Sequence, residues 1–517
     1  MLAKCFSGAL SGVDAQTVEI EVYSSIATSS FTIVGLPDAA VKEARDRVST
    51  AIKSSQFDIR KREFAITVNL APADVRKEGS LYDLPIAVCV LKAMGVLRNE
   101  HLDEYGLAGE LALSGEVRRV RGVLPIVMEM KRIGRKAVLV PYDNLEEASV
   151  VSGIDVIPVR SLREAAMFLN GEMTIAPVST DLAALVERDR SCGEDFADVK
   201  GQSMAVRAVE VAVAGGHNIL LIGSPGAGKT MIARRVPSIL PPLTVEEALE
   251  VSRIHSVAGL AKGADNFVTR RPFRAPHHTV SSIGLLGGGT HPTPGEVSLA
   301  HRGVLFLDEF AEFPRQTLEV LRQPLEDGHV GVSRAAAAHD FPSRFILVAA
   351  MNPCPCGYYS DPSRECRCNQ AQILKYQNRV SGPLLDRIDI QVGVPAVPVK
   401  DLQKYDSGDS SEKLRAEVVR ARNIQKERYR DMPGVITNAD ARSRDLADIC
   451  RLDAKAQEEI RRVIEQLNLS ARAYDRILRV SRTIADLAGS EDVRFEHVAE
   501  AANYRQLDDD NGKRFWA

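Results

Sequence analysis

A phosphate-binding pattern, G-x-x-x-x-G-K-[ST], constrains the fold of this chain more than any other feature of its sequence. The apolar run 218–222 comes directly before the pattern and predicts a buried strand, and residues 231–238 after it are compatible with a helix. Glycines in such a loop let successive backbone N–H groups face phosphate oxygens, and the helix N-terminus adds partial positive charge. The pattern consists of Gly223, Ser224, Pro225, Gly226, Ala227, Gly228, Lys229 and Thr230.

The last two residues of this loop supply the chemistry of a nucleotide site. Lys229 can reach the β- and γ-phosphates of a bound nucleotide, and the hydroxyl of Thr230 can bind Mg²⁺. The loop therefore predicts ATP and Mg²⁺ as cofactors. A glycine-rich turn that matches the pattern by chance is the alternative, and the motifs further along the chain argue against it.

Polar residues follow two further apolar strands. In P-loop enzymes the first acid after such a strand, here Asp308, helps to hold Mg²⁺, and an adjacent acid, here Glu309, can polarise the attacking water as a general base. Asn352 follows the next strand and can hydrogen-bond the attacking water or the γ-phosphate. A turn-forming residue before a proline is the alternative for Asn352.

The 517-residue chain is too long for one hydrophobic core, and its pattern changes along its length. Strand and helix signals alternate through residues 1–170, whereas residues 171–194 are polar, lack sustained periodicity and are expected to form a linker. Residues 195–395 are predicted to form an α/β nucleotide domain, with a parallel sheet covered by helices on both faces, and residues 396–517 a helical lid. The predicted strands are 17–23, 64–70, 137–140, 218–222, 303–307, 345–349 and 388–394, and the predicted helices include 39–54, 84–94 and 411–429.

The composition excludes several classes of protein. A net charge of −3 argues against a globally basic nucleic-acid-binding surface but allows a local basic channel. The sequence has no apolar run of membrane-spanning length, and its first residues lack the apolar core of a signal peptide. We therefore expect a cytoplasmic protein without a membrane partner.

The segment between the phosphate-binding loop and the acidic pair contains two unusual runs, R-P-F-R-A-P-H-H at 271–278 and P-G-E-V-S-L-A-H at 294–301. Together with C-P-C-G at 354–357 and G-P-L-L-D-R-I-D at 382–389, they resemble the ComM/YifB-type magnesium chelatase-like AAA+ ATPases over essentially the whole chain. The resemblance implies a Lon-protease-like α+β N-terminal domain, a P-loop AAA+ core with hairpin inserts, and a helical C-terminal lid. It also implies a homo-hexameric ring that drives branch migration of DNA.

The same resemblance implies roles for two arginines. Arg387 looks like an arginine finger that reaches the site of a neighbouring subunit, with an exposed ion pair as the alternative. Arg472 resembles a sensor residue of the lid that contacts the γ-phosphate in the same chain or in an adjacent one. Three nearby arginines are alternatives for that role: Arg476, Arg479 and Arg482.

Segments 281–293 and 328–341 resemble hairpins that line the pore of such rings. Arg334, in the second segment, and Arg274, in a basic cluster ahead of the first, can contact DNA phosphates, which gives sequence-independent and salt-sensitive binding. The alternatives are an ordinary exposed hairpin and a basic cluster that orders the subunit interface around ATP.

Eight cysteines in so long a chain do not make a disulfide scaffold, but four of them lie close together in the sequence. Four thiolates fit a tetrahedral, structural Zn²⁺ site in a reducing compartment. The spacing is C-x-C rather than the usual C-x₂₋₄-C, so free thiols or redox-sensitive pairs are the alternatives. The cluster consists of Cys354, Cys356, Cys366 and Cys368.

The N-terminal segment resembles Lon peptidases, which need a Ser–Lys dyad. A gapless alignment places Leu81 at the nucleophile position and Leu124 at the lysine position, and neither can attack an amide or accept a proton. Ser80 and Lys131 are nearby, but the register would have to shift to use them. We therefore expect this domain to act as a scaffold or a DNA guide rather than as a protease.

These observations predict an ATP-driven ring motor that acts on branched or single-stranded DNA, most simply a branch-migration helicase of homologous recombination or natural transformation. The alternative is an AAA+ subunit of the magnesium-chelatase type that remodels a protein partner. Such motors work with large partner subunits that carry a metal-ion-binding domain, and the sequence shows nothing of that kind.

Overall fold

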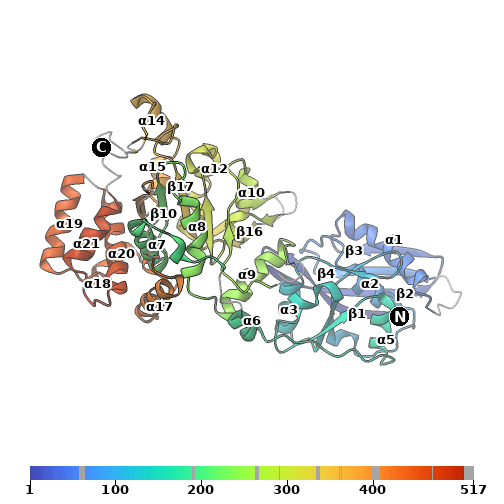
Figure 1. The fold of residues 1–517 in the computed structure, drawn as a ribbon. Helices are drawn as coiled ribbons and strands as arrows, with labels where there is room; N and C mark the ends of the chain where they lie inside the picture. The colour runs from blue at the N-terminus through green and yellow to red at the C-terminus, as the bar shows by residue number, and fades with distance from the viewer. Residues whose placement is uncertain are drawn as a thin grey trace.

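The computed structural model describes residues 1–57, 64–188, 193–261, 267–289, 292–333, 338–359, 361, 364–397, 408–467 and 470–505. Figure 1 shows an N-terminal domain at one end, a group of C-terminal helices at the other, and a sheet-containing core between them. Among the described residues, no helix is both long enough and apolar enough to cross a membrane.

The N-terminal domain is an α+β domain built on a seven-stranded sheet with strand order β3-β4-β2-β1-β5-β8-β9. Its helices α1 and α2 begin and end within one residue of the predicted bounds, and each predicted strand is present. The strands are β1 Leu2–Ser11, β2 Asp14–Ile26, β3 Ser30–Val34, β4 Phe64–Ala71, β5 Tyr105–Leu107, β8 Ala137–Pro141 and β9 Asp155–Val159. The helices are α1 Ala39–Ser54, α2 Asp83–Ala93, α3 Val123–Arg132, α4 Leu145–Ala148 and α5 Leu162–Leu169.

The segment expected to be a linker contains a short helix, α6 Leu182–Arg188. Leu182 and Val186 on this helix are buried in the hydrophobic core of the N-terminal domain. Two turns of helix carry too few apolar positions to show a helical period in the sequence, so this helix was not predicted.

The core is a five-stranded parallel sheet with strand order β11-β14-β17-β10-β18. Successive side chains of β10 lie on opposite faces of the sheet and belong to different hydrophobic cores. Ile219 and Leu221 pack with α7 and α8, whereas Leu220 and Ile222 pack on the opposite face. The predicted doubly covered parallel sheet is confirmed. The strands are β10 Ile219–Ile222, β11 Phe273–Arg274, β14 Val304–Leu307, β17 Ile346–Met351 and β18 Ile390–Gly393, and the helices include α7 Ser203–Gly215 and α8 Lys229–Ile239.

Helix α9 Val245–Val257 joins this core to the N-terminal domain. Its Ala248 lies in the N-terminal hydrophobic core, and the hydroxyl of Ser256 donates to the carboxylate of Glu147 at 2.6 Å. Figure 1 shows α9 beside α3, between the two domains.

The two inserts differ from one another. The first begins with a helix, α10 Ser282–Leu286, and its described residues pair β12 Gly287–Gly288 antiparallel with β13 Thr293–Pro294, so the hairpin character predicted near 281–293 lies in the second part of that segment. The second is a hairpin of β15 His329–Ser333 and β16 Ala338–Pro342. Toward the connected ends of its strands, the backbone N–H of Gly12 donates to Nδ1 of His339 at 3.1 Å, so this hairpin rests on the N-terminal domain.

The C-terminal region is helical in its described residues. Its helices pack against α7 of the core, and His217 joins the two parts because its ring nitrogens lie 3.0 Å from Asp389 and 2.8 Å from Thr483. The helices are α17 Ser411–Arg428, α18 Leu446–Ile449, α19 Ala454–Leu467, α20 Ala471–Leu487 and α21 Phe495–Asn503.

Candidate nucleotide-binding site

The phosphate-binding loop connects β10 to α8, at the carboxyl ends of the parallel strands. Gly226 and Gly228 have φ angles of +80° and +91°, which side chains with a Cβ rarely adopt, so these two glycines are needed for the turn. The loop ends at the N-terminus of α8, where unpaired N–H groups and the helix dipole favour an anion.

Lys229 lies over this loop. Its ammonium group donates to the backbone carbonyls of Gly223 at 2.7 Å and Ser224 at 2.9 Å. The same group lies 3.2 Å from Oδ1 of Asn352, which follows β17. Burial lowers the pKa of Lys229 to about 8, and the nearby carboxylate of Asp308 opposes that shift only in part. A phosphate would supply the negative charge that neutral carbonyls cannot.

The two predicted magnesium ligands are in contact. Asp308 follows β14, and its Oδ2 accepts a hydrogen bond of 2.8 Å from the hydroxyl of Thr230 at the start of α8. Hard oxygen donors of this kind suit Mg²⁺, which takes few protein ligands and completes its shell with phosphate and water. The residues present therefore fit the ion predicted from the sequence.

Glu309 projects into a cavity of about 780 Å³ that Thr230 and Asp308 also line. Its backbone is left-handed, with φ of +51°, a conformation that costs about 1–3 kcal/mol for a residue other than glycine. Its carboxylate is largely exposed and lies 3.1 Å from Nδ1 of His278. Sequence reasoning missed His278 as a partner of Glu309, although the signal was present in the R-P-F-R-A-P-H-H run.

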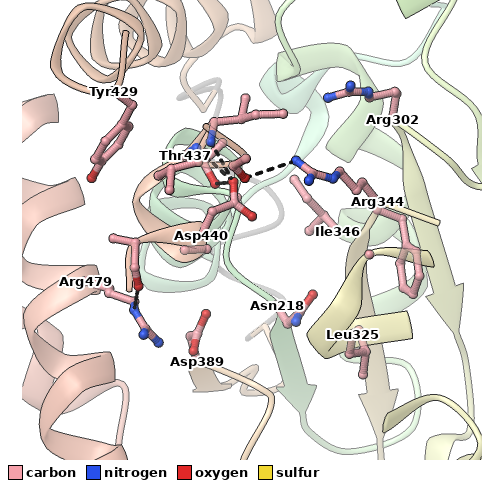
Figure 2. Close-up of a pocket in the computed structure, with 18 of the residues that line it drawn as sticks. Asn218, Arg302, Leu325, Arg344, Ile346, Asp389, Tyr429, Thr437, Asp440 and Arg479 are labelled. Atoms are coloured by element: carbon pink, nitrogen blue, oxygen red, sulfur yellow. Dashed lines mark hydrogen bonds between the residues drawn. The ribbon is translucent and has the colours of Figure 1, made fainter. Parts of the chain in front are cut away.

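Arg387 and Arg472 lie elsewhere. Both line a second cavity, of about 1110 Å³, which is also lined by residues at the amino ends of the parallel strands: Asn218, Gly303, Ile346 and Asp389. Figure 2 shows this cavity between the start of the sheet and the C-terminal helices. The four-residue strand β10, about 13 Å long, separates this edge from the phosphate-binding loop.

Both arginines have defined surroundings at this edge. Arg387 donates to the carbonyl of Pro383 at 2.7 Å and pairs with the carboxylate of Glu326. Arg472 is exposed in the first turn of α20. The chain thus brings Lys229, Thr230, Asp308, Glu309 and Asn352 together and keeps both arginines apart from them.

The structure describes one of the two residues predicted to contact DNA. Arg274 forms a two-point ion pair with Glu296, with N···O distances of 2.6 and 2.8 Å, so its charge is already neutralised within the chain. Sequence reasoning could not foresee this, because the partner lies 22 residues away in another element. Arg334 lies outside the described residues.

The four clustered cysteines converge on one point. All four Sγ atoms lie within 4.8 Å of one another, with separations that include 3.3, 3.6 and 3.7 Å. A tetrahedral zinc with Zn–S bonds of about 2.3 Å would hold its sulfurs about 3.8 Å apart. The donor set and its geometry therefore fit zinc despite the short C-x-C spacing.

The N-terminal domain does not assemble a peptidase dyad from the aligned positions. Leu81 and Leu124 are both buried in its hydrophobic core. The hydroxyl of Ser80 donates to the carboxylate of Glu110 rather than to a lysine.

The comparisons with known proteins cover the whole chain. Family models described as "Magnesium chelatase, subunit ChlI", "Subunit ChlI of Mg-chelatase" and "Magnesium chelatase, subunit ChlI C-terminal" match residues 195–402, 18–144 and 408–505. The chain is 44% identical to Competence protein ComM of Haemophilus influenzae over 98% of both chains, and 42% identical to the uncharacterized protein YifB of Escherichia coli over 96% of both. A stretch of 78 residues, 15% of the chain and 12% of the relative, is 33% identical to the Archaeal Lon protease of Methanocaldococcus jannaschii. This similarity along nearly the full length, joined to the nucleotide-site geometry, shows that the chain belongs to the ComM/YifB-type magnesium chelatase-like family of AAA+ proteins.

Proposed function

We propose that this protein is an ATP-driven motor that works as a homo-hexameric ring on DNA, and that it is a branch-migration helicase of homologous recombination or natural transformation. The observation that carries the ring is the separation of Arg387 and Arg472 from the phosphate-binding loop. Surfaces on opposite edges of one sheet can meet only between copies, through a head-to-tail contact, and such contacts close into rings when the rotation allows.

In this arrangement each residue has a defined task. The phosphate-binding loop and Lys229 orient the nucleotide, and Mg²⁺ held by Thr230 and Asp308 would neutralise charge on the β- and γ-phosphates. Glu309 polarises the attacking water, and Asn352 holds that water or the γ-phosphate. Arg387 of an adjacent copy supplies positive charge in the transition state, and Arg472 contacts the γ-phosphate.

The proposal of DNA as the partner is supported by two observations. A relative that matches the chain over 98% of both lengths is named a competence protein. In the sequence Arg334 comes directly after Ser333, the last residue of β15, and we propose that it contacts DNA phosphates. We further propose that the protein works in the cytoplasm.

ATP hydrolysis measured with and without four-way DNA tests this function. A motor of this kind hydrolyses ATP faster when four-way DNA is added, and it converts the junction into two duplexes only while ATP is hydrolysed. The family models name a magnesium chelatase subunit, which favours protein remodelling as the second candidate. Remodelling predicts that ATP hydrolysis is indifferent to DNA, so this outcome would select it.

We also propose that Cys354, Cys356, Cys366 and Cys368 hold a structural zinc. The convergence of their sulfurs supports it, and four thiolates are the donor set that structural zinc prefers. Metal analysis of the purified chain tests this site, with one zinc per chain expected and none after two of the cysteines are replaced by serine.

A further inference from the structure

The lobe between the two C-x-C pairs, residues 357–365, touches the phosphate-binding loop. The hydroxyl of Ser224 in that loop donates a hydrogen bond to the carboxylate of Asp361 in the lobe. Ser224 is buried and Asp361 is half-buried, so this contact is partly shielded from water. A carboxylate acceptor makes a stronger hydrogen bond than a neutral one.

A second contact lies next to the first. Gly357 has a φ angle of +85°, and a Cβ built on it would lie 2.6 Å from Cδ and 2.7 Å from Cγ of Pro225. The backbone of the lobe therefore packs so closely on the Pro225 ring that only glycine fits. Two adjacent residues of the phosphate-binding loop are thus held by residues of the cysteine lobe.

The described residues of the lobe also contact one another, and the N–H of Asp361 donates to the carbonyl of Tyr358 at 3.1 Å. The N–H of Gly357 donates to the carbonyl of Cys354 at 3.0 Å, and the guanidinium of Arg364 lies 4.2 Å from the centre of the Tyr358 ring. Arg364 and Glu365 are exposed. Apart from Gly357, the described residues of the lobe are half-buried or exposed, and the converging thiols lie at its two ends, so we expect the thiols to fix its shape.

We infer that the cysteine lobe is part of the nucleotide site: closed by the metal at its base, it holds Ser224 and Pro225 in the shape that binds phosphate, so that affinity for ATP depends on metal occupancy. The inference rests on the zinc and ATP sites proposed above. Because coupling between two sites is reciprocal, bound ATP must also tighten the retention of zinc by the same factor.

Four variants of the full-length chain separate the steps of this inference, with ATP affinity measured by titration without DNA and zinc measured by metal analysis. Cys366→Ser/Cys368→Ser should lose zinc and weaken ATP binding about tenfold, the range of allosteric couplings. Asp361→Ala and Gly357→Ala should keep zinc and still weaken ATP binding, because each breaks one contact with the phosphate-binding loop. Glu365→Gln, an exposed neighbour in the same lobe, should change neither quantity.

The reciprocal effect is measured in Glu309→Gln, which is expected to bind ATP without consuming it. Saturating ATP should lower the equilibrium transfer of zinc to a zinc-selective dye by the factor found for ATP affinity. ATP affinity that is the same with and without zinc, or normal in both Asp361→Ala and Gly357→Ala, would overturn the coupling. A chain that binds ATP but contains no zinc would overturn the metal step, and a wild-type chain that binds no ATP would overturn the proposed function instead.

Discussion

The two edges of the core sheet are built differently. At the carboxyl edge, the loop after β10 converges with the residues that follow β14 and β17. The ammonium group of Lys229 lies within hydrogen-bonding distance of Asn352 and is attracted by the carboxylate of Asp308. At the amino edge, Arg387 and Arg472 line a wide cavity together with residues from the starts of four strands. One edge holds the phosphate-binding loop and the groups predicted to act on a nucleoside triphosphate, and the other edge holds these two cations without such a loop.

Under the proposed function, this difference would divide the work of hydrolysis. The carboxyl edge would bind phosphate, hold Mg²⁺ and activate water, and the amino edge of a neighbouring copy would supply the charge that stabilises the transition state. Glu326 pairs with Arg387 in the single chain, and a phosphate of a neighbouring copy would have to replace Glu326 as the partner of this arginine. The predictions below test this division, in order of decreasing effect.

Arg387→Ala should lower the rate of ATP hydrolysis by about 10³-fold or more while each subunit still binds ATP, because an arginine finger acts only on the transition state. Mixing this variant with Lys229→Ala subunits sharpens the test, because some interfaces of a mixed ring then combine an intact carboxyl edge with an intact amino edge. Partial recovery of hydrolysis is expected. If mixed rings form and recover nothing at any ratio, the amino edge does not serve a neighbouring site. Arg461→Ala, an exposed substitution on α19, is the matched control.

Glu309→Gln should slow hydrolysis by about 10²–10⁴-fold, the usual contribution of a general base, with little change in ATP affinity. The amide keeps the shape of the side chain and its contact with His278 but cannot accept the proton of water. Rapid-quench measurement of a single turnover reads this step directly. Glu312→Gln, at an exposed carboxylate that pairs with Arg379, is the control and should hydrolyse ATP normally. Near-normal turnover in Glu309→Gln would remove Glu309 from this role.

Lys229→Ala should weaken ATP binding by about 10²-fold, because it removes charge-assisted hydrogen bonds to phosphate worth about 1.5–3 kcal/mol each. Equilibrium titration with a fluorescent ATP analogue measures the loss. Lys375→Ala, at an exposed position in α14 Gln370–Gln377, removes an equal charge away from the site and should bind ATP as the wild type does. Equal affinity in the two variants would show that the carboxyl edge does not hold phosphate.

The carboxyl edge could be predicted from the sequence because each of its motifs is short and contiguous. The glycines of 223–228 fix the loop, and residues that directly follow buried parallel strands must share one edge of the sheet. The amino edge could not be predicted in this way. Its surroundings depend on residues far apart in sequence, such as Glu326 beside Arg387, and no local pattern records such a pairing.

Two further features required the structure for the same reason. The contact between His278 and Glu309 joins residues that are 31 positions apart and that follow the neighbouring strands β11 and β14. The contact of Asp361 with Ser224 spans 137 positions, so the C-x-C pattern could suggest a metal but not its place beside the phosphate-binding loop. Helix α6 was missed because its apolar residues are too few to reveal a period.

At the carboxyl edge, a change of pH should alter ATP affinity less than the substitutions above do. Burial lowers the pKa of Lys229 to about 8, and only the protonated amine attracts phosphate. ATP affinity should therefore be constant from pH 7 to about 7.5 and then fall as the pH rises through 8, by at most about tenfold per pH unit. The phosphates of ATP are already ionised in this range, since phosphate groups titrate near pH 6. Titrations from pH 7 to 9.5 measure the fall, which Lys229→Ala should abolish.

The proposed DNA contact of Arg334 should give the smallest change. Each phosphate contact with single-stranded DNA contributes about 0.7 to the steepness of log affinity against log salt, so Arg334→Ala should reduce that steepness by about 0.7 for each subunit that engages the DNA. Arg274→Ala is the matched comparison: because Glu296 already neutralises Arg274, its loss should leave the slope unchanged. Fluorescence anisotropy with labelled single-stranded DNA at four salt concentrations measures both slopes, while ATP hydrolysis without DNA should be normal in Arg334→Ala. A lower slope in Arg274→Ala would mean that DNA displaces Glu296 from this arginine. An unchanged slope in both variants would place the DNA path elsewhere, most simply on the N-terminal domain, against which the β15–β16 hairpin rests.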